Sequence, residues 1–166
     1  MVREKTKMEK IVNQRRGCRQ KLWQKFRVAG LGNDPESTFR LLNLLDRNNL
    51  NIDVMIQSLG KDGTKSVSFT VAKPDMLRTI DVLNDNKDSL GIKKLDYDEN
   101  VAKISVIGAG VRSHSGVAAK MFGALANAGI NTEMITTSEI RITALIDETY
   151  ADQAMRAIHE TFLERV

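Results

Sequence analysis

The sequence predicts an α+β fold of two ferredoxin-like units, each with the order strand, helix, strand, strand, helix, strand. Along residues 25–97, apolar residues alternate between the period of a strand and that of a helix in this order. The segment KFRVAG at 25–30 then returns as KISVIG at 103–108, and LNIDVMIQS at 50–58 returns as INTEMITTS at 130–138. A repeat of this length indicates two supersecondary units in one chain.

Composition is that of a globular protein with a basic start. The 166 residues are 42% hydrophobic and 28% charged, without a membrane-spanning apolar run or a signal-peptide pattern. The single cysteine, Cys18, favours a reducing compartment, so we expect a cytoplasmic protein without a membrane partner. Residues 1–27 hold ten basic and two acidic side chains, a net charge of +8. The other 139 residues hold 15 basic and 19 acidic side chains, a net charge of −4.

Residues 1–24 form a basic arm for which the sequence predicts little regular structure. Ile11 and Val12 fit a strand, but no period of two or of 3.6 follows them. A solvated arm is the simpler interpretation of the charge, and contact with nucleic acid is the alternative.

The first unit, residues 25–97, begins with a strand and a helix whose start is clearly marked. KFRVAG is the strand, and Asp34 and Pro35 suit the cap and the first residue of a helix that continues to Leu45. A second strand follows over the segment that starts at Leu50.

A turn and a second helix complete the first unit. The turn at residues 61–63, Lys-Asp-Gly, lies between two apolar runs and predicts a hairpin. Pro74 starts the second helix, and residues 92–95 form a fourth strand. The residues predicted to face inward from this helix are Met76, Leu77, Ile80 and Leu83.

The second unit, residues 98–166, has the same elements with one strand too few. Its second helix carries an apolar stripe formed by Ala151, Ala154, Met155, Ile158 and Phe162, and no strand follows. A sheet that stops at three strands leaves unpaired backbone groups at its edge. We therefore predict a nested topology, in which the N-terminal arm around residues 11–12 supplies the fourth strand. A strand from a partner chain is the alternative.

The start of the first helix in each unit is the predicted ligand position. First-turn N–H groups lack helix partners and suit a carboxylate. In the second unit these donors belong to Gly116, Val117 and Ala118, and in the first unit to residues 36–38. Polar side chains on the neighbouring second strand can accept from an ammonium group, so a free amino acid fits. The polar side chains there are Asn51, Asp53, Gln57 and Ser58 in the first unit and Asn131, Thr136, Thr137, Ser138 and Glu139 in the second.

Other chemistries are weakly supported. Gly108 and Gly110 suggest a dinucleotide loop, but its third glycine would fall at Ser113. His114 has no evident nucleophile and orienting group beside it, and no cluster of metal ligands exists, so we expect no catalytic residue, metal or cofactor. The simpler interpretation of the site remains open, with Ser115 as a helix cap and Glu139 as a surface charge.

The segment IGAGVRSHSGV, followed by TTSEIRITALI, resembles the paired ACT domains at the C-terminus of aspartate kinases (aspartokinases). The segments DGTKSVSFTV and GIKKLDYDENVAKISVIGAG match as well, and the similarity covers about residues 27–162. The resemblance implies two nested ACT domains, with an early strand completing the second sheet.

The resemblance also implies a regulatory function. It predicts a region that senses lysine or threonine and feedback-inhibits the phosphorylation of aspartate. The catalytic domain is absent, so no kinase activity is expected from this chain alone. The implied partners are an amino-acid effector, a second copy in a homodimer through ACT domains, and a catalytic subunit. By position, the effector contacts would be Asn33, Pro35, Thr38 and Gln57 in the first unit, and Ser113, His114, Gly116, Val117, Thr137, Ser138 and Glu139 in the second.

Three departures from the family pattern affect these expectations. The usual DKPG of the first loop is NDPE, so Glu36 adds a negative charge where a carboxylate would dock. Ser115 replaces the proline of the second loop, and residues 13–24 do not match the family. A ferredoxin-like nucleic-acid-binding protein with a basic tail is the alternative function, although the sheets lack the aromatic pairs of RNA-binding domains. A phosphate-handling enzyme using Arg112 is a third possibility.

Overall fold

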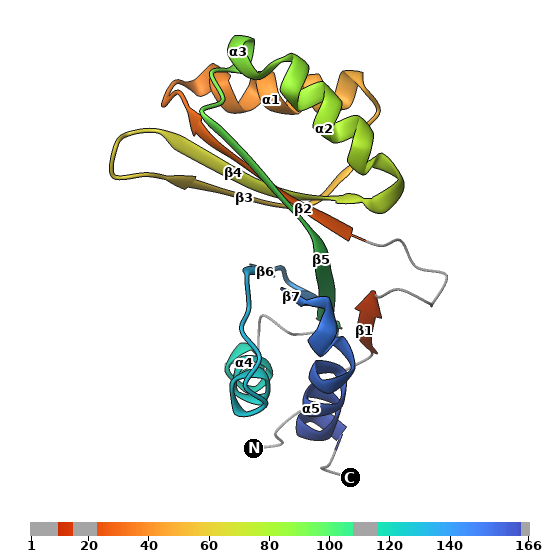
Figure 1. Ribbon diagram of the computed structural model, residues 1–166. Helices are drawn as coiled ribbons and strands as arrows, with labels where there is room; N and C mark the ends of the chain where they lie inside the picture. The colour runs from red at the N-terminus through yellow and green to blue at the C-terminus, as the bar shows by residue number, and fades with distance from the viewer. Residues whose placement is uncertain (1–9, 15–22, 108–115, 164–166) are drawn as a thin grey trace. The chain divides into compact units, whose positions relative to one another are not determined.

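The computed structural model describes residues 10–14, 23–107 and 116–163 (Figure 1). They form two compact units, one within residues 21–99 and one formed by residues 100–166 with the N-terminal strand. Each unit is an antiparallel sheet with two main helices, which confirms the predicted α+β class.

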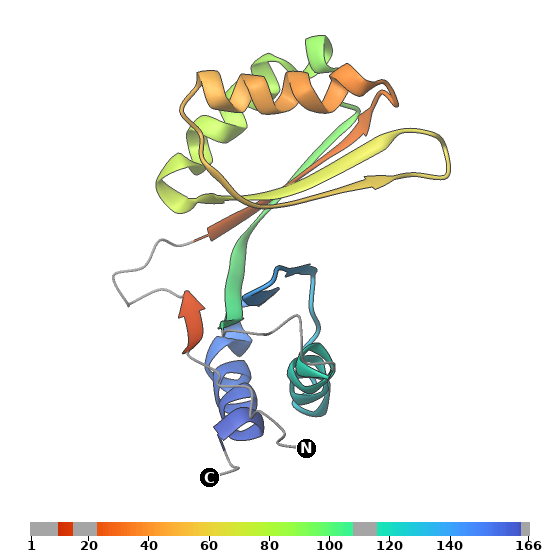
Figure 2. The same cartoon turned by 180° about the vertical axis from the view of Figure 1, so that it is seen from behind.

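The first unit has a four-stranded sheet in the order β3-β4-β2-β5. Both views show α1 and α2 on the same face of this sheet (Figures 1 and 2). A 3-10 turn at Lys73–Asp75 leads into α2. Its elements are β2 (Trp23–Leu31), α1 (Pro35–Arg47), β3 (Ile52–Leu59), β4 (Lys65–Ala72), α2 (Met76–Asp85), α3 (Lys87–Leu90) and the first part of β5 (Lys94–Ile107).

The core of the first unit lies between this sheet and its helices. Phe26 of β2 stacks on Phe69 of β4 with ring centroids 5.6 Å apart, and both side chains are fully buried. The prediction for α2 was wrong at one position, because Leu77 is 73% exposed. The α-helix begins at Met76, and the inward positions at helical spacing from it include Thr79 and Leu83.

The second unit repeats this arrangement. Its sheet has the order β6-β7-β5, with β1 on the free side of β5. The apolar stripe of its last helix is confirmed, with Ala151, Ala154 and Ile158 fully buried. The elements are the second part of β5, α4 (Val117–Asn127), β6 (Met134–Thr137), β7 (Arg141–Asp147), a 3-10 turn at Glu148–Tyr150, α5 (Ala151–Leu163) and β1 (Lys10–Gln14).

The fourth strand of the second sheet comes from the N-terminal arm. β1 pairs antiparallel with β5, in a register that joins Ile11 to Val106 and Val12 to Ser105. Strand β1 thus occupies the place that the fourth strand of the first sheet has beside β2. The nested topology predicted from the missing strand is confirmed.

One strand, β5, belongs to both units. The sequence predicted separate strands at 92–95 and 103–108, but the structure has a single strand, Lys94–Ile107. It lies beside β2 in the first sheet, and from Val101 onward it pairs with β7 in the second. The intervening residues, DYDENVA, contain no glycine or proline, so nothing in them interrupts extended backbone.

Lys103 is a buried lysine on β5. Its neighbours Ala102 and Ile104 belong to the helix-covered core, so Lys103 lies on the other face of the strand, and it is 3% exposed. Ser105 and Thr143 share that face and are joined by a hydrogen bond of 2.7 Å. Burial, with a smaller contribution from Arg141, lowers the pKa of Lys103 from 10.5 to about 7.

Deletion of residues 1–14 should selectively destabilise the second unit. Without β1, one edge of β5 loses its backbone partners. We expect faster hydrogen exchange of the amides of residues 103–107, while those of Phe26 and Val28 in the first sheet keep their protection. Equal protection of both strands would contradict the role given to β1.

Replacement of Gly30 by alanine should destabilise the first unit through a steric clash. Gly30 has φ +85°, and an added Cβ would lie 2.5 Å from Cβ of Lys93. We expect the free energy of unfolding to fall by about 2 kcal/mol or more, measured by urea denaturation. Gly63→Ala is the matched control, since Gly63 has φ +77° but open space around it. Equal losses in the two variants would show that backbone strain, not the clash, is responsible.

Replacement of Lys103 by methionine should change how stability depends on pH. Between about pH 7 and 10 the unfolded state binds more protons at Lys103 than the folded state, so wild-type stability rises with pH. The slope is at most about 1.4 kcal/mol per pH unit. We expect Lys103→Met to be the more stable protein at pH 6 and its advantage to shrink by pH 9. Parallel curves for wild type and variant in urea denaturation would refute this, and Lys120→Met on the surface of α4 is the control.

Candidate functional site

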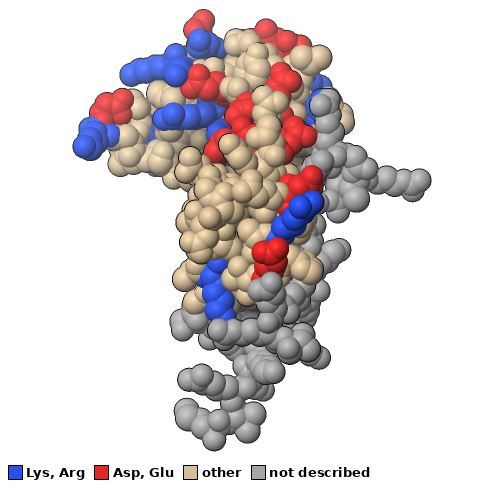
Figure 3. Space-filling view, turned by 60° about the horizontal axis from the view of Figure 1, so that its bottom comes forward, with Lys and Arg blue, Asp and Glu red and all other residues tan. Residues whose placement is uncertain are grey.

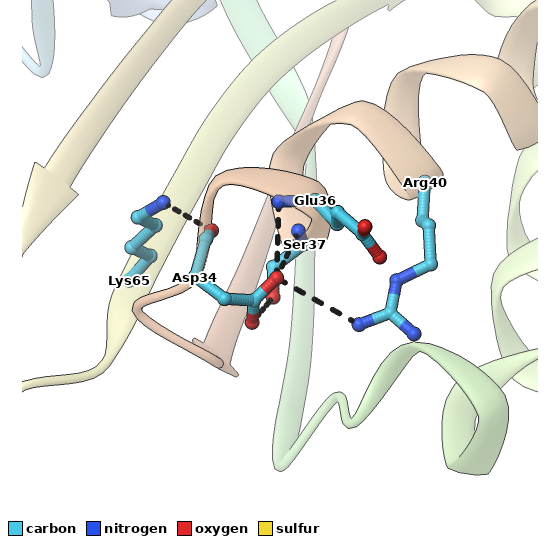
Figure 4. Close-up of polar contacts among 5 residues, drawn as sticks. All are labelled: Asp34, Glu36, Ser37, Arg40 and Lys65. Carbon is cyan, nitrogen blue, oxygen red and sulfur yellow. Dashed lines mark hydrogen bonds and ion pairs between the residues drawn. The ribbon is translucent and has the colours of Figure 1, made fainter.

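The start of α1 is closed by the side chain of Asp34. Asp34 Oδ1 accepts hydrogen bonds from the backbone N–H of Glu36 at 3.0 Å and of Ser37 at 2.8 Å. The Ser37 hydroxyl donates to Oδ2. Figure 4 shows the carboxylate folded against the first turn of the helix. The predicted roles of Asp34 as cap and Pro35 as first helical residue are confirmed.

Two cations lie near this cap. Lys65 Nζ donates to the backbone oxygen of Asp34 at 2.8 Å, and an Arg40 guanidinium nitrogen lies 3.9 Å from Oδ1 (Figure 4). The side chains of Arg40 and Asp34 are both about half exposed, so this ion pair is weak. The hydrogen bond from the Ser37 hydroxyl is the main reason why the pKa of Asp34 lies below its ordinary value. The carboxylate is therefore ionised at neutral pH.

The structure brings together two of the residues predicted to contact an effector in the first unit. Thr38 Oγ1 on α1 donates to Gln57 Oε1 on β3 at 2.5 Å. Asn33 and Pro35 are exposed at the mouth of the loop, and Asn51 is exposed ahead of β3. Of the first-unit set, only Thr38 and Gln57 are therefore shown to meet, where α1 passes β3, and Asn51 lies beyond the other end of α1.

The start of α4 in the second unit differs from that of α1. Its cap is Gly116, with φ +102°, and it has no side-chain hydrogen bond to the first turn. The side chains of Val117 and Ala118 are apolar, the first buried and the second half-buried. Any hydrogen bond from these two residues to a ligand would therefore come from the backbone N–H groups. Ser113 and His114 lie outside the described residues. So does Ser115, and the cap residue of α4 in the described part of the chain is Gly116.

The polar residues of the second strand have varied surroundings. Thr137 pairs with Ile142 at the end of β6 and is exposed. The Ser138 hydroxyl accepts from the backbone N–H of Arg141 at 3.1 Å, and its own N–H donates to the Arg141 oxygen at 2.7 Å. Ser138 therefore closes the β6–β7 hairpin. Glu139 is exposed in this hairpin and takes part in an interaction of its own.

Asn131 lies at a groove that the sequence did not predict. The groove has a volume of about 530 Å³ and is located where α4 ends and β6 approaches. This is the opposite end of α4 from Gly116, so Asn131 and the helix start do not share one site. The lining residues are Phe122, Leu125, Ala126, Gly129, Ile130, Asn131, Thr132 and Ile135.

On the described part of the face in Figure 3, acidic and basic side chains are interspersed and neither kind forms a large patch. Within the described ranges, no group of three His, Cys, Asp or Glu residues is placed to hold a metal ion. No helix in that part of the chain is long and apolar enough to cross a membrane.

Several contacts at the α1 start were missed by sequence analysis. Asp34 was identified as a cap, but the part of Ser37 in holding its carboxylate was not, although serine three residues after a capping aspartate is a readable signal. The contact from Lys65 spans 31 residues and has no local signature.

Lys103 was missed because one charged residue in an apolar strand gives no indication of its burial.

Comparison with known proteins identifies the family. The sequence profile of the ACT domain matches residues 104–162. The aspartokinase of Pseudomonas aeruginosa is 37% identical over 83% of this chain and 34% of its own length. That of Mycolicibacterium smegmatis is 40% identical over 83% of this chain and 33% of its own. The chain thus spans about a third of the length of these curated relatives.

Two solved structures resemble this chain over nearly the full length of both proteins. A chain in the crystal structure of aspartokinase alpha and beta subunits superposes with a TM-score of 0.84 and 37% identity, covering 94% of this chain and 99% of that one. The ligand-free regulatory subunit of aspartate kinase from Thermus thermophilus gives 0.84 and 28%, covering 93% and 98%. This chain belongs to the aspartokinase family and corresponds to its regulatory region of two ACT domains.

Proposed function

We propose that this chain is an amino-acid sensor that controls an aspartate kinase. The likeness to a regulatory subunit across 98% of that subunit's length supports the proposal, because that protein is a regulatory subunit of an aspartate kinase. In this proposal lysine or threonine is the effector, and feedback inhibition of aspartate phosphorylation is the outcome.

The helix start of the second unit is the proposed docking point for the effector carboxylate. Gly116, the cap residue of α4, has no side chain to bond the first-turn N–H groups, and no other side chain of the described ranges is seen to cap them. The helix dipole favours an anion there. The expected polar contacts beside it, Thr137 and Glu139, lie on the second strand and its hairpin.

The proposal includes two partners. One is a catalytic subunit, as the structure of aspartokinase alpha and beta subunits suggests. The other is a second copy of this chain, joined through ACT domains. Exposed apolar side chains along the α1–β3 edge support a protein contact there, since Phe39 is 64% and Leu59 62% exposed. Binding between copies would let the effector change the arrangement of ACT pairs and so bias the kinase. A cytoplasmic location fits this function.

Calorimetric titration of the purified chain with lysine and threonine tests the sensor function. We expect saturable binding of one of them. Ala119→Glu should abolish it, because a glutamate at this position can reach back to the N–H groups of the helix start. Asn127→Glu, exposed near the other end of α4 and outside the lining of the groove at Asn131, is the matched control and should bind like wild type. Absence of heat with either amino acid in the wild-type chain would refute the proposal.

A further inference from the structure

The two units have equivalent outer edges with different surfaces. The alignment of residues 50–58 with 130–138 extends back through the preceding helices, because Leu45 of α1 and Leu125 of α4 fall at equivalent positions and are both buried. Strands β3 and β6 stand at the two ends of the strand order in the described sheet. Each unit therefore has one edge formed by a helix and a strand, α1 with β3 and α4 with β6, and the two edges can be compared position by position.

The α1–β3 edge carries apolar side chains that project into water. Phe39 on α1 is 64% exposed, and Leu59 at the end of β3 is 62% exposed. Met55 on the same strand is 37% exposed. In the second unit the positions of the first two are held by an alanine and a glutamate, Ala119 and Glu139. This projection is therefore particular to the first unit, and burying it against another surface is favourable.

The α4–β6 edge has a hollow instead. The groove of about 530 Å³ lies on this edge, and Phe122 of α4 and Ile135 of β6 both line it. Ala126 lines it too, and the equivalent residue of α1 is Asp46, which is larger and charged. The small side chain of Ala126 leaves the groove open and without a charge at this point, so the groove suits an apolar side chain.

Two like edges do not match one another in this respect. Two α1–β3 edges would set projecting side chains against each other, and two α4–β6 edges would set groove against groove. An α1–β3 edge placed against an α4–β6 edge lets the first fill the second. The backbone supports the same contact, because among the described residues β3 and β6 each have one side without a neighbouring strand. Unpaired N–H and C=O groups on that side can bond to another strand.

We propose that the α1–β3 edge of one copy of this chain docks on the α4–β6 edge of a second copy, with the Phe39 side chain in the groove beside Ala126. This inference rests on the second copy named as a partner in the proposed function, and it specifies which unit meets which. Each copy thus offers one projecting edge and one receiving edge.

Disulfide cross-linking between two differently tagged variants tests the pairing. Both variants carry Cys18→Ser, which removes the only cysteine of the sequence, and they are co-expressed with either Phe39→Cys or Ala126→Cys. We expect mild oxidation, with lysine and threonine present, to join the two tags, whereas each variant expressed alone gives no cross-link. Leu77→Cys is the matched control, since Leu77 is 73% exposed on α2, and it should cross-link with neither.

Sedimentation of variants that damage one edge each tests the same contact without a covalent bond. Phe39→Asp spoils the projecting edge, and Ala126→Trp fills the groove. Each variant alone should self-associate about tenfold more weakly than wild type or worse. Their mixture should associate more tightly than either alone, because the intact projecting edge of one fits the intact groove of the other. Leu77→Asp should behave like wild type.

The outcomes separate this inference from the proposed function. Cross-links within Phe39→Cys alone or Ala126→Cys alone would show that like edges meet, which would overturn the inference and keep the second copy as a partner. Self-association of wild type without a cross-link in the mixture would overturn it as well. If wild type stays monomeric with and without amino acid, the inference and the second-copy partner both fail, while heat from lysine or threonine binding would still uphold the sensor.

Discussion

The pairing of β1 with β5 is the contact on which the second unit depends. Five residues of β1 align with residues 103–107 and complete the sheet that α4 and α5 cover. Because the whole first unit separates the two strands in sequence, this contact closes a long loop. The entropic cost of closing a loop grows only with the logarithm of its length. The insertion of the whole first unit between β1 and β5 therefore adds little to the cost of pairing these strands. Strand β5 serves both sheets, and therefore the two units share backbone as well as sequence pattern.

Much of this architecture could be predicted because it follows from the local periodicity of the sequence and from the number of strands expected in each unit. The repeat gave the two units, and the lack of a fourth strand in the second pointed to residues 11–12. What failed depends on details beyond periodicity. Leu77 is apolar and lies in the right helix, but the 3-10 turn ahead of Met76 sets which positions face inward. The single strand β5 was read as two because its polar middle, residues 96–100, gives no apolar signal.

The location of the candidate site could be predicted from the sequence, but the hydrogen bonds made within it could not. The sequence located the helix starts, the adjacent strands and the capping role of Asp34. It did not show that Thr38 and Gln57 would bond to each other, because a side-chain contact across 19 residues depends on how helix and strand pack. Nor did it show the difference between an aspartate cap in one unit and a glycine cap in the other, which makes two similar motifs into unlike helix starts.

The position of β1 also has a consequence for the order in which the protein is made. β1 leaves the ribosome before the first unit, yet its partner strand is synthesised about 90 residues later, on the order of ten seconds at ordinary elongation rates. During that interval strands β2, β3 and β4 of the first unit are already made, while β1 lacks its partner strand. The pairing partner of β1 is therefore made only after the whole first unit, and β1 lacks that partner until then.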